Sequence, residues 1–529
     1  MAVRRFGGAR LRRAGRSRAG VVLLALALYL AAGAASTWPA LRDADSAFLA
    51  RSSGAAGPVD AGDHLQSAYQ LWLPGHQLAR GEAPWRDPYG FAPYVEGRTT
   101  FAGWPFALVF APLQALVGTV GAWNLLVLFS YAVAGLLTFA WLRELGLPRV
   151  AAIAAGLAFA LAPYRVAQLA LGHQLALVAL LLPLALWALE RRLLLLAAAA
   201  LASIPLSGQV HLALGAIPFV ALYAALRPAD DGFRRRIGAA AAVTVPAVAA
   251  GAVVWALVVR GSLGAGGRSF AQVELYSAAV ADLVARAPRG GLETFVLLGW
   301  LTPLLALAGA AVASRARPRL ALVLALGAAV PVLLALGANL PGYERLWEAV
   351  PGLRDTRVPG RFVPIAALCL AALVAFAVAR LPRAAALAAV ALVAVDLRAG
   401  VELFAPGGAD PANPVYAQRP ASDPLLELPL FLPDRQEGSV YLYYAIDAPG
   451  PRYAAYSTVA PKWIDGRLRE LDPFECGRRG LEYPEWVMVH RPLYAGRARC
   501  LGRLLDGLSR MGYREVARDG ELTLYRLGD

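Results

Sequence analysis

The positive charge of this chain is concentrated in six short segments that separate long apolar runs. The sequence has a net charge of +15, and these segments together hold 20 Arg and only four acidic residues. The rest of the chain is nearly neutral, with 31 basic and 32 acidic residues. Because basic residues stay in the cytoplasmic loops of membrane proteins, the pattern predicts a membrane topology. The segments are residues 1–19, 143–149, 190–192, 227–236, 315–319 and 380–383.

The composition indicates a polytopic α-helical membrane protein of the plasma membrane. Hydrophobic residues make up 58% of the chain and charged residues 16%, and the mean hydropathy is +0.52. The topology accounts for the basic pI, so the lipid bilayer and not nucleic acid is the expected partner. The first apolar run continues past Trp38, and we therefore interpret it as a retained span, not a cleaved signal peptide.

About eleven spans are predicted, with the N-terminus in the cytoplasm and the C-terminus outside. The apolar segment 104–119 is not counted, because Pro105 and Pro112 interrupt it and because a crossing there would move later basic loops outside. We predict that it forms a juxtamembrane or re-entrant helix. The predicted spans lie near residues 20–40, 121–142, 150–165, 174–189, 193–206, 210–226, 237–259, 294–314, 320–337, 362–379 and 384–400.

The chain divides into two predicted domains. Residues 1–400 form the transmembrane domain, which includes a large first outer loop at 41–120. Residues 401–529 are richer in Pro, charged and aromatic residues, and form a small extracytoplasmic α/β domain with strands expected in SVYLYYAI, EWVMVH and LTLYRL. Cys476 and Cys500 lie outside the membrane in this domain, where an oxidised pair can form.

The first outer loop contains the strongest local signal for a site. Leu65, Tyr69 and Trp72 follow Asp63 at helical spacing, which is typical of an amphipathic helix on the membrane surface. An Asp at this position also suits a helix cap, since Gln stands three residues later. Asp60, three residues earlier, suits a turn equally well.

Several segments resemble the GT-C fold glycosyltransferases, a superfamily that includes aminoarabinose transferases and protein O-mannosyltransferases. The segments are SAYQLW, APYRVAQLALGHQLAL, YSAAVADLV, LRDTRVPGRFVP and LELPL, and the likeness extends over most of residues 20 to 500. The resemblance implies a membrane glycosyltransferase that moves a sugar from a polyprenyl-phosphate donor to an extracytoplasmic lipid, glycan or protein acceptor. It also implies a catalytic base in the first outer loop, where Asp63 matches best and Asp60 second.

The chemistry of an inverting transfer fits these residue types. A carboxylate accepts the proton of the acceptor hydroxyl while the lipid phosphate leaves. Asp87 and Glu96, in the same loop, are candidates to contact the acceptor or a divalent metal. Their spacing is no recognised metal signature, and many GT-C enzymes act without a metal.

Four cationic or imidazole side chains are candidates to bind the donor phosphate. Arg165 and His173 stand where a predicted span ends at the outer membrane surface. Arg357 and Arg361 stand where another predicted span begins at that surface. A guanidinium at headgroup depth can bind phosphate oxygens in a fork. The three arginines would equally serve as interfacial anchors whose apolar stems lie in the membrane, and the alternative for His173 is a hydrogen-bonded polar residue between helices.

Two other functions remain open from the sequence. The first is a transporter or lipid flippase, although such proteins tend to have repeated halves and ionisable groups at mid-membrane, whereas the charges of this chain lie in its predicted outer loops. A non-catalytic relative that acts in cell-envelope assembly would keep the same motifs. No glycine-rich phosphate loop is present, so the sequence gives no support to a nucleotide site.

Overall fold

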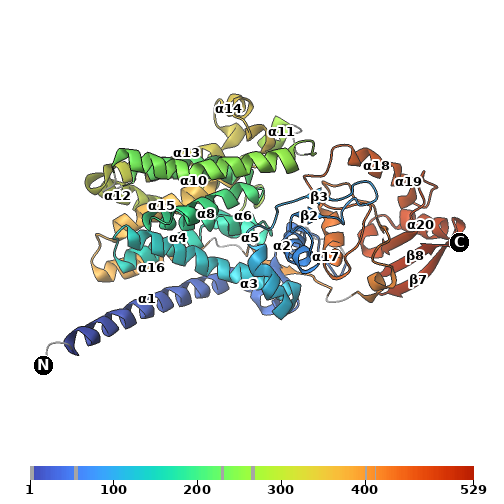
Figure 1. Cartoon of the computed structure of the whole chain (residues 1–529), viewed down its shortest axis with the longest axis horizontal. Helices are drawn as coiled ribbons and strands as arrows, with labels where there is room; N and C mark the ends of the chain where they lie inside the picture. The colour runs from blue at the N-terminus through green and yellow to red at the C-terminus, as the bar shows by residue number, and fades with distance from the viewer. Residues whose placement is uncertain are drawn as a thin grey trace.

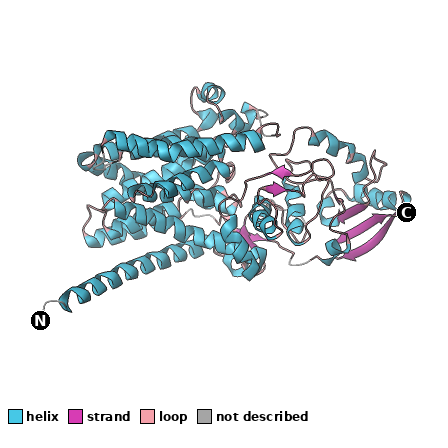
Figure 2. Ribbon diagram, in the orientation of Figure 1, coloured by secondary structure: helices cyan, strands magenta, loops and turns pink. Residues whose placement is uncertain are grey.

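The computed structural model has a helical bundle at one end and a smaller α/β domain at the other (Figures 1 and 2). It describes residues 5–52, 57–227, 232–263, 268–398, 402–410 and 413–528, with side chains from residue 19 onward. This order, a helical membrane domain followed by a domain with a mixed sheet, agrees with the fold class predicted from composition.

The bundle is built from apolar helices rich in Ala, Leu and Val, which pack against one another or face lipid. Most of them lie roughly parallel to the long axis of the molecule (Figure 1). They are α1 (Arg5–Thr37), α3 (Ala107–Glu144), α4 (Arg149–Ala160), α5 (Pro163–Ala170), α6 (Leu175–Val178), α7 (Leu181–Glu190), α8 (Leu194–Leu206), α9 (Val210–Leu226), α10 (Phe233–Val254), α12 (Leu301–Ala316), α13 (Pro318–Ala335), α15 (Val363–Val378) and α16 (Arg383–Leu397).

Five helices in the described residues are long and apolar enough to cross a membrane, which makes the chain a multi-pass membrane protein by helix composition. They are Ala19–Thr37, Ala107–Glu144, Phe233–Val259, Pro318–Ala335 and Pro359–Val378. A sixth arises if α4 and α5, which meet at a bend of 42°, count as one broken span.

The structure therefore does not establish the predicted number of about eleven spans. Four further predicted spans coincide with apolar helical segments of only 10–17 residues. The eleventh predicted span, 384–400, coincides with α16, which has 15 residues. A straight helix needs about 20 residues to cross the hydrocarbon core, so these helices cannot be counted by length alone.

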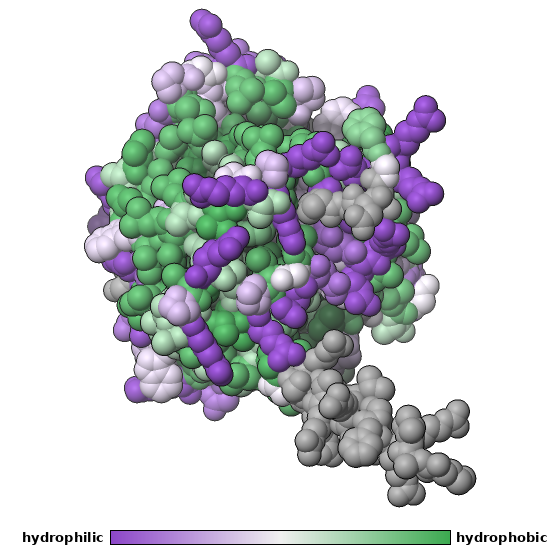
Figure 3. Space-filling view, turned by 90° about the vertical axis from the view of Figure 1, so that its left-hand side faces the viewer, coloured by the Kyte–Doolittle hydropathy of each residue, from purple (hydrophilic) through white to green (hydrophobic). Residues whose placement is uncertain are grey.

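Four of the six basic segments meet in contacts at one end of the bundle. Arg191 lies 3.1 Å from the Glu144 carboxylate, Arg227 lies 3.9 Å from Glu190, and Arg317 donates to the Leu145 carbonyl at 2.7 Å. Figure 3 views the end of the molecule that carries the N-terminus, where hydrophilic side chains project over an otherwise apolar surface. The sequence prediction that these four loops lie on the same side is confirmed.

The uncounted apolar segment 104–119 is set apart from the helix that follows it. The run Ala107–Glu144 is broken at Gly118, whose φ of 73° and ψ of 175° are not helical. Residues other than glycine rarely adopt such a positive φ, so Gly118 allows the chain to change direction between two helical segments. The residues before the break thus form a separate helix, as predicted, and their place relative to the membrane stays a prediction.

The C-terminal domain contains a four-stranded sheet in the order β5-β6-β8-β7. The β5 and β6 strands are parallel, and the other two pairs are antiparallel. The strands are β5 (Leu425–Leu428), β6 (Trp486–His490), β7 (Tyr513–Asp519) and β8 (Leu522–Leu527), and the helices are α17 (Ser439–Asp447), α18 (Ile464–Glu470), α19 (Asp472–Glu475) and α20 (Ala498–Arg510).

Two of the three predicted strands are confirmed, and the third is wrong. EWVMVH and LTLYRL contain β6 and β8, whereas SVYLYYAI forms the helix α17. Residues 439–446 are all buried, so no alternation of polar and apolar residues distinguishes a strand from a helix there. The high β-propensity of Tyr and Val is overridden by packing of α17 against the first outer loop.

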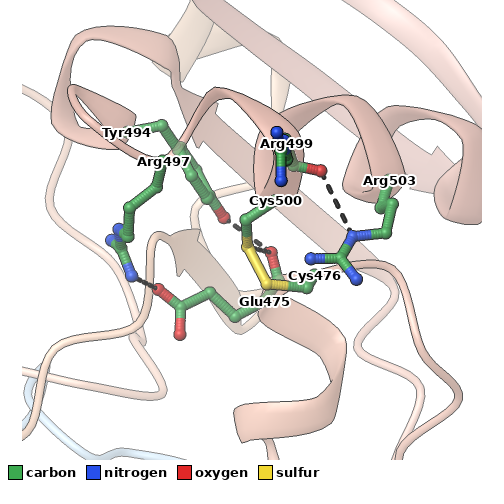
Figure 4. The surroundings of a disulfide bond; sticks show 7 residues. All are labelled: Glu475, Cys476, Tyr494, Arg497, Arg499, Cys500 and Arg503. Carbon is green, nitrogen blue, oxygen red and sulfur yellow. Dashed lines mark hydrogen bonds and ion pairs between the residues drawn. A yellow bond between two sulfur atoms is a disulfide. The ribbon is translucent and has the colours of Figure 1, made fainter.

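The predicted disulfide between Cys476 and Cys500 is present (Figure 4). It joins the end of α19 to α20 and closes a loop with a sequence separation of 24, which in a chain-entropy description stabilises the domain by about 3 kcal/mol. The Tyr494 hydroxyl and the Arg497 guanidinium both bond to Glu475 beside it. Cys369 is free and buried in α15, as expected of a packing residue.

The first outer loop, residues 41–120, packs between the bundle and the C-terminal domain. Its helix α2 (Asp63–Ala79) packs against α3 on one side and α17 on the other, and lies between the two parts of the molecule (Figure 1). Strand β1 (Phe48–Ala50) pairs with β4 (Ala405–Gly407), and β2 (Arg86–Asp87) pairs with β3 (Arg98–Thr99). The predicted helix after Asp63 is confirmed, but protein covers it on two sides.

The remaining helical segments are short, and two of them, η2 and η6, are continuous with α10 and α15. They are α11 (Phe270–Leu275) and α14 (Tyr343–Ala349), the π-helix η2 (Trp255–Val259), and the 3-10 helices η1 (Ala40–Asp43), η3 (Val280–Leu283), η4 (Gly337–Asn339), η5 (Leu353–Asp355), η6 (Pro359–Phe362), η7 (Pro414–Gln418), η8 (Gln436–Gly438) and η9 (Arg491–Tyr494).

Candidate active site

A cavity of about 290 Å³ lies at the junction between the bundle and the C-terminal domain. Its walls come from α2, the loop before α3, the α8–α9 turn, the end of α10, and residues 355–361 and 456–459. Five of the eight predicted site residues line it: Asp63, Asp87, His173, Arg357 and Arg361. Segments far apart in the sequence therefore build one site.

Asp63 is the first residue of α2, and its carboxylate faces other segments rather than its own helix. One carboxylate oxygen, Oδ2, lies 2.6 Å from His173 Nε2, and Oδ1 accepts a hydrogen bond of 2.7 Å from the Tyr456 hydroxyl. Gly62 is the residue before the helix, and no side chain caps this terminus. The interpretation of Asp63 as a helix cap is therefore wrong.

Gly172 explains why His173 reaches the start of α2. Its φ is +80°, and a Cβ built on it would lie 2.3 Å from the backbone nitrogen of His64. Only glycine combines this left-handed conformation with so close a backbone approach. The turn after α5 can thus rest against α2 and present the imidazole of His173 to Asp63.

A hydrogen-bonded chain continues from His173 into the bundle. His173 Nδ1 lies 2.8 Å from Gln168 Oε1, and Gln168 Nε2 donates to Glu293 Oε2 at 2.8 Å. The other oxygen of Glu293 accepts a hydrogen bond of 2.6 Å from Arg361 Nη2. Asp63, His173, Gln168, Glu293 and Arg361 thus form a continuous network with two carboxylates and a guanidinium.

The network stabilises the ionised forms of both carboxyl groups. Burial alone would raise the pKa of Asp63, but the hydrogen bond and charge of His173, with hydrogen bonds from Gln436 and Tyr456, hold that pKa well below its usual range. Burial also acts to raise the pKa of Glu293, and the charges of Arg361 and His173 outweigh it and lower that pKa to about 2. Both groups are carboxylates at neutral pH.

Three arginines from two separate loops line the same cavity: Arg268, Arg357 and Arg361. Burial, and then the positive charges of Arg357 and Arg361, lower the pKa of Arg268, which places the three cations close enough to repel one another. The Arg357 guanidinium lies 5.5 Å from the ring centre of Tyr276. An anion between these side chains would relieve the repulsion and accept their hydrogen bonds.

Asp60 lies outside this site. Its Oδ2 accepts a hydrogen bond of 2.8 Å from the Gly408 backbone, and its own N–H donates to the Gly408 carbonyl. It holds the chain beside β4 and does not line the cavity. Of the two predicted base residues, the structure brings only Asp63 to the cavity.

Asp87 has its own partners at the cavity wall, and the last two predicted residues, Glu96 and Arg165, lie outside the cavity. Asp87 is buried at the cavity wall, where the Tyr69 hydroxyl donates to it at 2.9 Å and Arg98 forms an ion pair with it. Glu96 is exposed and does not line the cavity. Arg165 is fully buried in α5, where it donates to the carbonyls of Ala160 and Ser130. It also does not line the cavity.

Sequence reasoning missed four residues of the site: Glu293, Gln168, Tyr456 and Arg268. Gln168 stands in the same motif as His173, five residues earlier, which was a usable signal. Arg268 and Glu293 belong to the segment 260–293, in which no residue is among the predicted site residues. Tyr456 is 393 residues from its partner Asp63, and no local pattern could have joined them.

The cavity also has an apolar wall. Leu206 of α8, Val210 of α9, and Val254, Val258 and Val259 at the end of α10 and in η2 line it. Neighbouring side chains of the same segment, Val253, Trp255 and Leu257, are exposed in the bare protein and suit contact with lipid. The site can therefore accept a molecule with an anionic head and an apolar tail.

Within the described part of the chain, no three His, Cys, Asp or Glu side chains gather so that they could hold a metal ion. The two oxygens of the Glu293 carboxylate each accept a hydrogen bond from a side chain, one from Gln168 and one from Arg361.

The chain has the fold of the GT-C glycosyltransferases, as the sequence resemblance predicted. Arabinofuranosyltransferase AftD from mycobacteria superposes with a TM-score of 0.57 at 17% identity, over 96% of this chain and 41% of AftD. ArnT from Cupriavidus metallidurans gives 0.51 at 16% identity, over 96% of this chain and 98% of ArnT. The oligosaccharyltransferase of Archaeoglobus fulgidus gives 0.50 at 13% identity, over 96% and 74%.

At these identities the likeness establishes the fold and not a shared substrate. This chain spans about two fifths of the length of AftD and nearly all of ArnT. No protein-family model and no curated protein matches the sequence.

Proposed function

We propose that the protein is a GT-C glycosyltransferase that moves one sugar, with inversion, from a polyprenyl-phosphate donor to an extracytoplasmic acceptor. The observation that carries the proposal is the placement of an ionised carboxylate, Asp63, in the same cavity as Arg268, Arg357 and Arg361. Base and cations are the two groups that this transfer requires. The GT-C fold supports the same reaction class.

In the proposed reaction the acceptor oxygen attacks the anomeric carbon of the donor sugar while its proton passes to Asp63. The bond between that carbon and the phosphate oxygen breaks, and its electron pair leaves with the phosphate. The three arginines stabilise the charge that develops on this leaving group. The apolar wall formed by α8, α10 and η2 suits the first isoprene units of the donor.

A donor-binding measurement tests this proposal without knowledge of the sugar or acceptor. The protein in lipid nanodiscs is titrated with polyprenyl phosphate and, separately, with the uncharged polyprenol of the same length. We expect the phosphate to bind at least about tenfold more tightly, because charged hydrogen bonds contribute roughly 1.5–3 kcal/mol. Equal affinities would contradict the proposal, as would net movement of the lipid across a bilayer without transfer, the mark of a flippase.

We propose further that the basic end of the bundle faces the cytoplasm, and that the cavity and the C-terminal domain face outward. In right-side-out membrane vesicles, Ser422→Cys should react with an impermeant maleimide and Gly232→Cys should not. Both positions are exposed, and Gly232 has open space for a side chain. The native thiol background is low, because Cys369 is buried and the other two cysteines are bonded. The opposite labelling pattern would reverse the orientation.

A further inference from the structure

The protonation of His173 can be read from its neighbours, beginning with Glu293. An ionised carboxylate accepts hydrogen bonds and donates none, so the Gln168 group that faces Glu293 Oε2 at 2.8 Å must be the amide NH2. The carbonyl oxygen of the same amide then faces His173 Nδ1, also at 2.8 Å. Since a carbonyl oxygen only accepts, Nδ1 must carry a hydrogen.

The second ring nitrogen of His173 faces another acceptor. Nε2 lies 2.6 Å from Asp63 Oδ2, and the other oxygen of Asp63 already accepts from the Tyr456 hydroxyl. A carboxylate that accepts from the Tyr456 hydroxyl on one oxygen accepts from Nε2 on the other, so Nε2 also donates. An imidazole that donates from both nitrogens is an imidazolium cation.

We propose that His173 is held as an imidazolium between two acceptors and positions Asp63 as an ionised base. The assignment of Asp63 as base rests on the proposed glycosyl transfer, whereas the charge of His173 does not. Negative and positive groups then alternate along the network: Asp63, His173, Glu293 and Arg361. Their side chains are at most 25% exposed, so a balanced set of charges costs far less than any one charge alone.

The imidazolium has two effects on Asp63. It keeps the carboxylate in the form that accepts a proton, since loss of the neighbouring cation would leave burial as the dominant effect on its pKa. It also fixes the orientation of the carboxylate together with Tyr456. Four lone-pair positions on the two oxygens leave room for an acceptor hydroxyl, because Asp63 lines the cavity.

Asp63 and Glu293 interact directly with His173, and further charged and titratable groups interact with these two carboxylates or with one another. Glu293 Oε1 lies 3.6 Å from Nδ1 and adds a second attraction for a cation there. The further groups are His64 of α2, Tyr164 of α5, His211 of α9, Arg268, Arg357, Arg361 of η6, and Tyr456 of the C-terminal domain.

Nitrogen-15 NMR of histidine-labelled protein in nanodiscs tests the charge directly at pH 7. Both ring nitrogens of His173 should resonate as protonated nitrogens, and this signal should be absent from His173→Gln. His64 and His490 are internal controls, because burial lowers their pKa values to about 4 and about 3 and keeps them neutral. One unprotonated ring nitrogen in His173 would overturn the proposal.

The pH profile of glycosyl transfer tests the positioning role. The low pKa of Asp63 means that transfer is fully present above the usual carboxyl range and is lost only in strong acid. His173→Gln should raise the pH at which transfer is lost in acid, the acid limb of the profile, by about one unit or more. His173→Lys keeps a cation and should reverse much of that shift. An unchanged limb in His173→Gln would refute the role.

The two measurements separate the two proposals. An imidazolium signal from a protein that shows no glycosyl transfer with any donor would leave the charge of His173 established and would contradict only the proposed function. A neutral His173 in a protein that does transfer a sugar would support the proposed function and contradict only the charge of His173.

Discussion

Asp63→Asn should lower glycosyl transfer by about a hundredfold or more and leave the protein folded in the membrane. The substitution keeps the size of the side chain but removes the group that takes the acceptor proton, and general bases contribute about 10²–10⁴-fold. Because Asp63 does not cap α2, the helix loses no capping bond. Single-turnover transfer and thermal unfolding of the same preparation measure the two effects separately.

Asp60→Asn is the matched control. It makes the same chemical change three residues earlier, at a carboxylate that binds the Gly408 backbone outside the cavity. We expect transfer to stay within about threefold of the unmodified protein, with a stability loss of about 1 kcal/mol. Full activity in Asp63→Asn, or a larger loss in Asp60→Asn than in Asp63→Asn, would show that the base is assigned wrongly.

Arg357→Ala should weaken binding of polyprenyl phosphate by about tenfold or more and lower turnover as well. A charged hydrogen bond to phosphate contributes about 1.5–3 kcal/mol, and it acts in both the ground state and the transition state. Arg354→Ala is the matched control, because Arg354 is exposed on the same segment and does not line the cavity. Equal donor affinity in the two variants would remove Arg357 from the phosphate site.

Arg361→Ala should weaken donor binding and also destabilise the fold. Arg361 forms a 2.6 Å ion pair with Glu293, whose side chain is only 16% exposed. Removing one partner of a largely buried pair leaves an unpaired charge and destabilises the fold by up to about 3–5 kcal/mol. The Arg357 guanidinium lies over the ring of Tyr276. Substitution of Arg357 therefore tests phosphate binding with less damage to the fold.

The bundle was predictable because membrane helices are marked by local composition. Long apolar runs locate the helices, and basic residues mark the loops that the structure brings together, as the contact of Arg317 with Leu145 illustrates. Span number was less predictable, because helices such as α8 and α16 are too short to be assigned by length. Gly118, which breaks the helix after residue 117, is one of many glycines in the sequence and gives no special local signal.

The site was predictable only in part. The residue types and outer loops suggested Asp63, His173 and Arg361, but the choice between Asp63 and Asp60 depends on which carboxylate meets a tertiary partner. Sequence reasoning could not find Glu293 or Tyr456, because their importance arises from contacts with residues more than 60 positions away. Arg165 is a predicted phosphate ligand because it is an arginine near the expected depth of the lipid headgroups. In the structure its guanidinium donates to backbone carbonyls inside the bundle instead.

A structure of the protein bound to polyprenyl phosphate in nanodiscs tests the central claim most directly. We expect phosphate density within hydrogen-bonding distance of Arg357 and Arg361, in the cavity that also holds Asp63, with the prenyl chain along Val254 and Val258. Density for the phosphate elsewhere on the protein, with this cavity empty at saturating lipid, would contradict it.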